Sequence, residues 1–224
     1  MAKKTKNPGF PGSSDRFYFE RRLLAQVGRV AGGDEAGRGP WAGPVAASLV
    51  ILDPGKIDPR INDSKRLKPE LRDELSAIIK RDALAFGIGL ATAPEIDRIN
   101  ILEATRLAFV RAWEALSIKP DYILFDAIRV DGIECPQEAL IQGDGRSYSI
   151  AAASILAKVA RDGILQELDR RYPAYGFSRH KGYGTPEHQE ALRKWGPCPQ
   201  HRKSFRPIQE FDSLASQRKK RAGT

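Results

Sequence analysis

The stretch Asp34-Glu35-Ala36-Gly37-Arg38-Gly39 closes the first strongly β-like run of the chain, residues 29–35. It places two neighbouring carboxylates just before an arginine that is flanked by glycines. Carboxylates bind hard cations such as Mg²⁺, glycines let a backbone approach a ligand closely, and arginine suits phosphate. A metal site beside a phosphate or sugar site is what phosphodiester chemistry requires. The stretch therefore predicts a strand that ends in such a site.

The sequence around this stretch predicts the surrounding fold. A Gly/Pro-rich turn leads from it into a second strand at residues 42–52, so these two strands should be antiparallel neighbours. Patterns typical of further strands occur at residues 83–91, 122–126 and 139–142, and patterns typical of helices at 17–26, 69–81, 95–117, 149–172 and 186–195. Strands followed by alternating strands and helices indicate an α/β sandwich around a mixed sheet.

Length and composition set limits on the class of protein. The chain has 224 residues, of which 41% are hydrophobic, and this suits one well-cored domain with extensions. No apolar run reaches the roughly 18 residues of a membrane span, and the polar N-terminus lacks the apolar core of a secretory signal. Cys135 and Cys198 form neither a disulfide framework nor a paired metal motif. We therefore expect a cytoplasmic protein without a membrane partner.

Charge is unevenly distributed along the chain, whose formal net charge is +9. Residues 1–27 hold 6 Lys and Arg against 2 Asp and Glu, and residues 193–224 hold 9 against 2. Clustered basic charge favours binding to phosphate backbones. For the run Arg218-Lys219-Lys220-Arg221, nucleic-acid contact and a merely solvated tail are equally good interpretations.

Asp34, Asp126 and Asp144 each close or follow a short apolar strand, so rigid backbone should hold all three near one end of the sheet. Carboxylates gathered in this way repel one another, and a divalent cation usually relieves that repulsion. One strand-terminal aspartate alone would more often cap a turn, but three beside a Gly-Arg-Gly favour a metal site. Glu35 is less certain, because neighbouring residues of a regular strand point to opposite faces.

Several motifs together make the chain resemble ribonuclease HII, the bacterial type 2 ribonuclease H, over roughly residues 29–208. In chain order these motifs are Asp34-Glu35-Ala36-Gly37-Arg38-Gly39-Pro40, Asp63-Ser64-Lys65, Phe125-Asp126, Gly143-Asp144, Ser149-Ile150-Ala151-Ala152-Ala153-Ser154, Arg161-Asp162, His180-Lys181-Gly182-Tyr183-Gly184-Thr185 and His201-Arg202-Lys203-Ser204-Phe205.

The resemblance implies a fold and an activity. The fold would be a ribonuclease H-like mixed β-sheet flanked by helices, with a helical C-terminal extension. The activity would be hydrolysis of the RNA strand of RNA–DNA hybrids and cleavage 5′ to ribonucleotides embedded in duplex DNA, leaving 3′-hydroxyl and 5′-phosphate ends. On this basis we expect a basic, partly disordered extension at residues 1–27, a catalytic core at 28–184, and a helical extension with a basic tail at 185–224.

The resemblance also implies residue roles. Asp34, Glu35, Asp126 and Asp144 would be the catalytic acids and would hold two divalent ions, Mg²⁺ or Mn²⁺. The family's glycine-arginine-glycine, here Gly37, Arg38 and Gly39, would read the ribose 2′-OH, and Tyr183 would abut the ribo–deoxyribo junction. Ser64 and Lys65 are expected to reach a phosphate. We expect a monomer; a sliding clamp is a conceivable partner, but no clamp-binding peptide is clear in Gln209-Glu210-Phe211-Asp212-Ser213-Leu214.

Three alternatives stay open at this point. Asp131 competes with Asp126 for its role, because the segment between them departs from the family pattern. A ribonuclease HIII-like enzyme is the nearest rival activity, and a non-catalytic nucleic-acid-binding protein on the same fold is the rival from another class. The three histidines lack zinc-ligand spacing, so surface or capping roles are expected for His180, His188 and His201.

Overall fold

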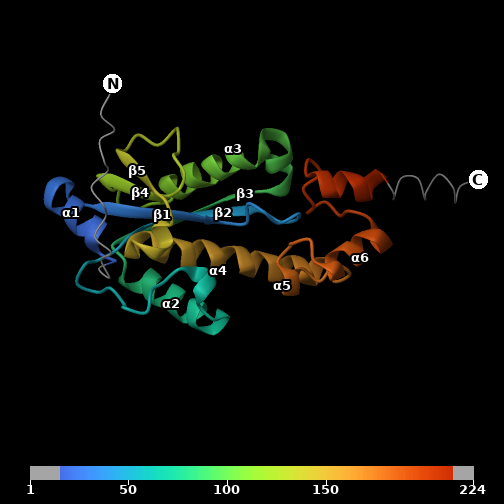
Figure 1. The fold of residues 1–224 in the computed structure, drawn as a ribbon, viewed down its shortest axis with the longest axis horizontal. Coiled ribbons are helices and arrows are strands. Elements are labelled where there is room, and N and C mark those ends of the chain that lie inside the picture. The colour runs from blue at the N-terminus through green and yellow to red at the C-terminus, as the bar shows by residue number, and fades with distance from the viewer. Residues whose placement is uncertain (1–15, 214–224) are drawn as a thin grey trace, which may run out of the picture.

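A computed structural model describes residues 16–213 (Figure 1). The start of the predicted N-terminal extension and the basic run Arg218-Lys219-Lys220-Arg221 lie outside these residues. Within them, five strands form one sheet in the order β3-β2-β1-β4-β5. The strands are β1 (Val30–Ala36), β2 (Val45–Ile51), β3 (Ala85–Ala91), β4 (Tyr122–Asp126) and β5 (Gln137–Leu140).

The sheet is mixed, as predicted. β2 is antiparallel to β1 and to β3, whereas β4 is parallel to β1 and to β5. β2 begins three residues later than expected, at Val45, because Pro44 has no N–H to give to a ladder. β5 lies two residues earlier than predicted, because the backbone turns left-handed at Gln142, with φ 55°.

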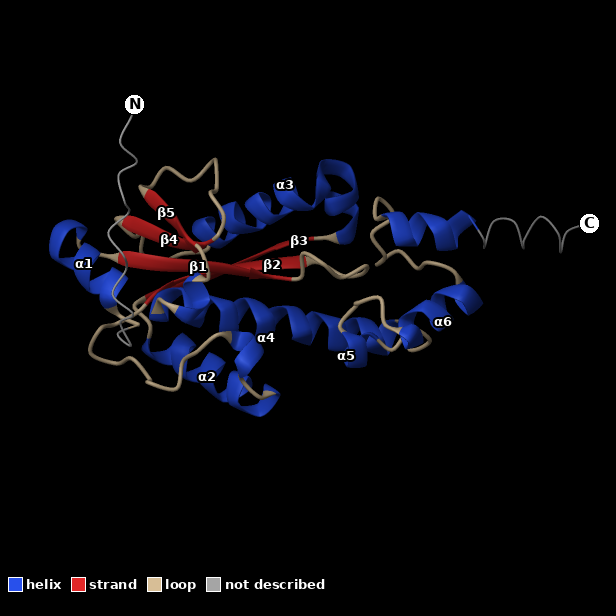
Figure 2. Ribbon diagram, viewed as in Figure 1, coloured by secondary structure: helices blue, strands red, loops and turns tan. Residues whose placement is uncertain are grey.

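Helices cover both faces of the sheet (Figure 2). They are α1 (Tyr18–Val27), α2 (Pro69–Asp82), α3 (Ala93–Glu114), α4 (Tyr148–Arg171), α5 (Phe177–His180) and α6 (Pro186–Trp195), and residues 206–213 are helical as well. α3 packs on β2 and β3, while α4 packs on β1 and β2 from the other side and separates α2 from the sheet. Among residues 16–213, no helix is long and apolar enough to cross a lipid bilayer.

Close packing at β1 brings the start of α4 against the strand. A Cβ on Gly32 would lie 2.1 Å from the backbone carbon of Ser149, so only glycine permits this approach. The first half of α4 is buried on nearly all sides, as its run of alanines and aliphatic residues predicts. The loop before α4 is thereby fixed at the end of β1 and β4, where the predicted carboxylates stand.

Candidate active site

Three aspartates predicted to share one end of the sheet do meet there. Asp34 lies on β1, Asp126 ends β4, and Asp144 lies in the 3₁₀ helix Gly143–Gly145. One carboxylate oxygen of each lies within 4.8 Å of those of the other two. Because β1 and β4 are parallel neighbours, Asp34 and Asp126 emerge side by side. Asp144 joins them because the Gly143 N–H donates a 2.8 Å hydrogen bond to Oδ1 of Asp126.

The cluster concentrates negative charge in a buried place. Burial, and then the carboxylates of Glu35 and Asp126, raise the pKa of Asp34 well above its ordinary value. Burial also raises the pKa of Asp144, with further contributions from Asp63 and Asp126. The ammonium of Lys65 lies 3.6 Å from Oδ2 of Asp144 and forms an ion pair with it. An all-oxygen cluster with this excess of negative charge suits a hard divalent cation.

Glu35 stands beside this group but is not one of the three clustered carboxylates. Its Oε1 accepts a 3.4 Å hydrogen bond from Arg38, whereas its Oε2 is buried without a hydrogen-bond partner. Burial raises the pKa of Glu35 against the opposing effect of Arg38. A buried carboxylate oxygen without a partner is costly, and a bound cation would satisfy it. The side chain of Glu35 is thus available to a metal, and its role as a fourth ligand stays a prediction.

The Gly-Arg-Gly loop leaves the end of β1 directly after these acids. Gly37 has a φ of +99°, which an L side chain rarely adopts, and Arg38 projects a half-exposed side chain. A Cβ on Gly39 would lie 3.7 Å from Cε1 of Tyr183, so the tyrosine ring stands over this glycine.

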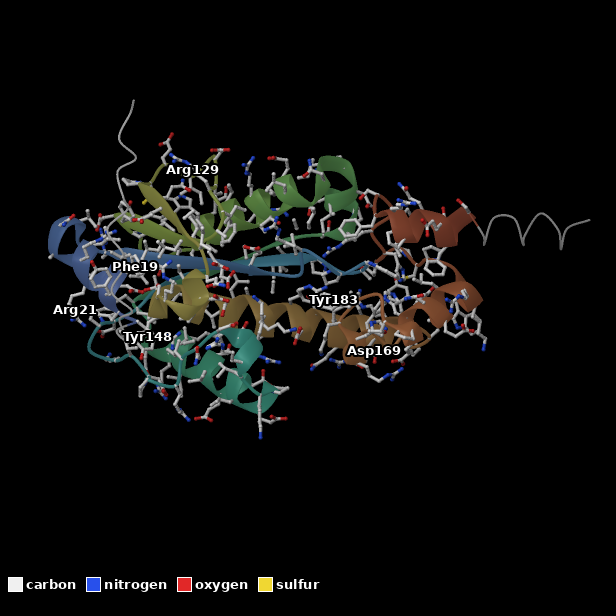
Figure 3. All side chains as sticks on the ribbon, viewed as in Figure 1. Phe19, Arg21, Arg129, Tyr148, Asp169 and Tyr183 are labelled. Atoms are coloured by element: carbon white, nitrogen blue, oxygen red, sulfur yellow. The ribbon has the colours of Figure 1, made fainter. Side chains whose placement is uncertain are left out.

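Tyr183 itself is 49% exposed and lies in the turn between α5 and α6, where the C-terminal part of the chain meets the end of the sheet (Figure 3). Tyr183 thus lies in a loop, as the flanking glycines Gly182 and Gly184 indicate. A second chain segment thus contributes an exposed aromatic ring to the surface beside the carboxylates.

Ser64 and Lys65 open the 3₁₀ helix Ser64–Arg66 on the other side of the cluster. Lys65 is 80% exposed at its side chain and extends toward Asp144. Ser64 is buried, and its N–H donates a 3.2 Å hydrogen bond to Oγ of Ser154. The position of Lys65 suits a phosphate contact, whereas Ser64 fixes the turn that carries Lys65. Substrate contact by either residue stays a prediction.

Asp131, the competitor for the role of Asp126, lies apart from the cluster. Its side chain is 76% exposed and its Oδ2 lies 3.6 Å from Nη1 of Arg106. The strand-end argument therefore selects Asp126 as the member of the cluster. Asp162, from the motif Arg161-Asp162, forms an ion pair with Lys158 and accepts a 2.7 Å hydrogen bond from it.

Surface or capping roles are expected for the three histidines, and the surface alternative is wrong. Two of them do cap turns, because Nδ1 of His180 accepts a hydrogen bond from the N–H of Gly182 and Nδ1 of His201 accepts one from the N–H of Cys198. His180, His188 and His201 are buried together between α5, α6 and the segment that follows α6. The Nε2 atoms of His188 and His201 lie 2.9 Å apart, and Nδ1 of His188 lies 2.9 Å from the carbonyl oxygen of Tyr183. The histidines are about ten residues apart in sequence and carry no shared motif, so no sequence signal reveals the cluster.

Sequence reasoning also missed the part played by two arginines. In the sequence Arg161 and Arg202 stand out only as members of family motifs, yet both are fully buried beneath the Gly-Arg-Gly loop. Their guanidinium groups donate hydrogen bonds to backbone carbonyl groups of that loop and of its neighbours.

Comparison with known proteins gives concordant matches. Residues 31–208 match the protein family described as Ribonuclease HII. A Ribonuclease HII of Geobacillus kaustophilus (strain HTA426) is 56% identical over 200 residues, which are 89% of this chain and 76% of that protein. A Ribonuclease HII of Syntrophotalea carbinolica is 51% identical over 195 residues, 87% of this chain and 93% of that protein. The crystal structure of a ribonuclease H2 from Pyrococcus horikoshii OT3 is similar, with a TM-score of 0.71 and 29% identity, covering 83% of this chain and 97% of that one.

Proposed function

Because the chain belongs to the ribonuclease HII family and is therefore a type 2 ribonuclease H, we propose that it cuts two kinds of substrate. One is the RNA strand of an RNA–DNA hybrid, and the other is duplex DNA with an embedded ribonucleotide, which it cuts on the 5′ side. The products would carry 3′-hydroxyl and 5′-phosphate ends. The observation that carries this proposal is the convergence of Asp34, Asp126 and Asp144 within 4.8 Å.

The acidic cluster is the group that would hold metal. Asp34, Asp126 and Asp144 would be the ligands, and the unpartnered Oε2 of Glu35 is a fourth oxygen beside them. When bound there, two Mg²⁺ or Mn²⁺ ions supply Lewis-acid stabilisation of the attacking and leaving oxygens of an in-line displacement. The rigid ends of β1 and β4 hold the carboxylates in place, so little reorganisation is required when the substrate arrives.

Substrate recognition falls to the surface next to the carboxylates. The Gly-Arg-Gly loop would read the 2′-OH of the ribonucleotide, because this hydroxyl is what distinguishes RNA from DNA at a given position. A Cβ on Gly39 would lie 3.7 Å from Cε1 of Tyr183, and this ring would pack against the neighbouring sugar. Lys65, on the other side of Asp144, would contact a backbone phosphate.

The proposed division of labour follows from these positions. The core at residues 28–184 carries the acids, the loop and Tyr183, and the described part of the extension, residues 185–213, supports the loop through Arg202. All the groups named above come from one chain, so a monomer is expected to be competent.

A nicking assay tests the proposal directly. Duplex DNA with a single ribonucleotide, labelled at either end of that strand, should be cut once on the 5′ side of the ribonucleotide, and only when Mg²⁺ or Mn²⁺ is added. Asp34→Asn should abolish cutting while the circular-dichroism spectrum and melting temperature persist. Asp131→Asn is the matched control, because it removes an exposed carboxylate far from the cluster and should cut like the wild type. Cutting in EDTA, or on the 3′ side, would contradict the proposal.

A further inference from the structure

Two buried arginines, Arg161 and Arg202, lie under the Gly-Arg-Gly loop without an ion pair to an acid of residues 16–213. Arg161 comes from α4, and Arg202 comes from the segment after α6 that runs against the loop (Figure 1). Their exposed fractions are 1% and 0%. No carboxylate of residues 16–213 lies within ion-pair distance of either guanidinium. Arginine is rarely buried in full unless it is paired, so these two need another explanation.

Backbone carbonyl groups take the place of the missing acids for Arg202. Its Nη2 donates to the oxygen of Gly37 at 2.6 Å, its Nη1 to that of Arg38 at 2.9 Å, and its Nε to that of Gly43 at 3.0 Å. The backbone of Arg202 is itself fixed, because its N–H donates to the oxygen of Trp41 at 2.8 Å. Arg202 is therefore held by the same segment that it organises.

Arg161 completes the arrangement from below. Its Nε donates to the oxygen of Pro44 at 2.9 Å, and its Nη2 and Nη1 donate to the oxygens of Ala42 and Lys181, each at 3.1 Å. A Cβ on Gly37 would lie 2.0 Å from Nε of Arg161, so the loop rests directly on this side chain. Through Lys181, Arg161 also ties the loop to the turn that carries Tyr183.

The bonds to Arg202 decide which way the loop's donors point. In a trans peptide the carbonyl group and the following N–H point in opposite directions. Since the carbonyl groups of Gly37 and Arg38 turn inward to Arg202, the N–H groups of Arg38 and Gly39 turn away from it. Neither N–H donates a hydrogen bond to another residue within 16–213. The loop thus offers two unused donors on the side away from the buried guanidinium.

We propose that Arg202, supported by Arg161, is a positioning residue that fixes the direction of the ribose-reading loop and thereby sets the selectivity for a 2′-OH. This inference rests on the proposed function, because it assigns a cause to the recognition of ribose by that same loop. The oxygen of a 2′-OH accepts hydrogen bonds, so two outward N–H groups suit it, whereas a hydrogen at that position offers them nothing.

The charges of the two arginines agree with this role. Burial lowers the pKa of Arg161 to about 10, and burial together with the nearby Arg161 lowers that of Arg202 to about 9. Both therefore stay protonated at neutral pH and place positive charge beneath a surface that receives an anionic strand. Lysine would keep that charge, but it lacks the planar fork that reaches three carbonyl oxygens at once.

Arg202→Lys is consequently the informative variant. Its kcat/KM should be compared on two duplexes that differ only at one sugar, a ribonucleotide or its 2′-fluoro analogue, under single-turnover conditions. We expect about a 100-fold loss on the ribonucleotide, as for a misplaced recognition group, and a much smaller loss on the analogue, so that the selectivity ratio falls at least about tenfold. A purely structural defect would reduce the active fraction and lower both rates by one factor. An unchanged ratio in a folded variant would overturn the inference.

The matched control is Arg111→Lys. Arg111 also donates to a backbone carbonyl, that of Leu90 at 2.6 Å, but it lies on α3, away from the loop. Its selectivity ratio should equal that of the wild type, whatever its stability.

A measurement on the wild type covers the case in which Arg202→Lys does not fold. Hydrogen exchange of the Arg38 and Gly39 amides should slow when a ribonucleotide-containing duplex is added in EDTA, and should slow less with the all-deoxy duplex. Equal protection by both duplexes would contradict the inference. If the wild-type enzyme nicks its substrate but either experiment gives the contradicting result, the role of Arg202 is refuted while the proposed function is retained. If the wild type does not nick, the proposed function itself fails.

Discussion

Lowering the pH should weaken the C-terminal part of the fold through its buried histidines. A carbonyl oxygen can only accept a hydrogen bond, so Nδ1 of His188 must carry a proton and donate it to the carbonyl oxygen of Tyr183. The backbone N–H of Cys198 donates a 2.9 Å hydrogen bond to Nδ1 of His201, so this nitrogen carries no proton. The proton of His201 therefore lies on Nε2 and is donated to Nε2 of His188. Each ring then carries one proton, and a second proton on either ring would break a hydrogen bond inside a buried cluster.

The magnitude follows from the pKa values. Burial lowers the pKa of His188 from 6.5 to about 4 and that of His201 from 6.5 to about 3. The unfolded chain therefore binds more protons than the folded chain at pH 5, and stability falls as the pH drops from about 7 toward about 4. At pH 5 each histidine should make the protein about 2 kcal/mol less stable than at pH 8. The raised pKa values of Asp34 and Asp144 act in the opposite direction, so the wild-type curve alone is not diagnostic.

Comparison with His188→Gln isolates the effect. Glutamine can still donate to the Tyr183 carbonyl but does not titrate, and the carboxylates are the same in both proteins. Urea unfolding at pH 8, 7, 6 and 5 should show the wild type more stable at pH 8, with the gap shrinking by about 2 kcal/mol by pH 5. A gap that does not change with pH would refute the reasoning and would mean that His188 titrates alike in both states.

Four further predictions concern the site. Gly37→Ala should lower the free energy of unfolding by about 1–3 kcal/mol in a urea titration, because Gly37 has a positive φ and lies against the buried side chain of Arg161. Gly39→Ala should stay folded and should lose activity on both a continuous hybrid and a single embedded ribonucleotide. Tyr183→Ala should lower kcat/KM more on the single ribonucleotide than on the hybrid, and equal losses would reduce it to general packing. Asp126→Asn should abolish cleavage while Asp131→Ala costs little; the reverse ranking in steady-state kinetics would exchange their roles.

The sheet and the carboxylate cluster could be predicted because both depend on local pattern. Apolar runs that end in an aspartate place that aspartate at a strand end, and parallel neighbours bring such ends together. β5 lies two residues earlier than its sequence pattern predicts, and the reason is local as well. The side chain of Gln137 bonds the N–H and the carbonyl of Val130, which starts the pairing early, and left-handed Gln142 then ends the extended stretch.

The buried histidines and arginines could not be predicted, because their partners are distant backbone atoms and, for His188 and His201, each other's rings, which only the folded chain brings together. Hydropathy assigns arginine to the surface, since its burial without an acid is normally unfavourable. Here the carbonyl groups of Gly37, Arg38 and Gly43, some 160 residues from Arg202 in sequence, replace the acid. Without the segment after α6, those three carbonyl groups would lose Arg202 as their hydrogen-bond donor. The boundary proposed at residue 184 therefore separates the catalytic residues from those that support them. The shape of the Gly-Arg-Gly loop still depends on Arg202, which lies beyond that boundary.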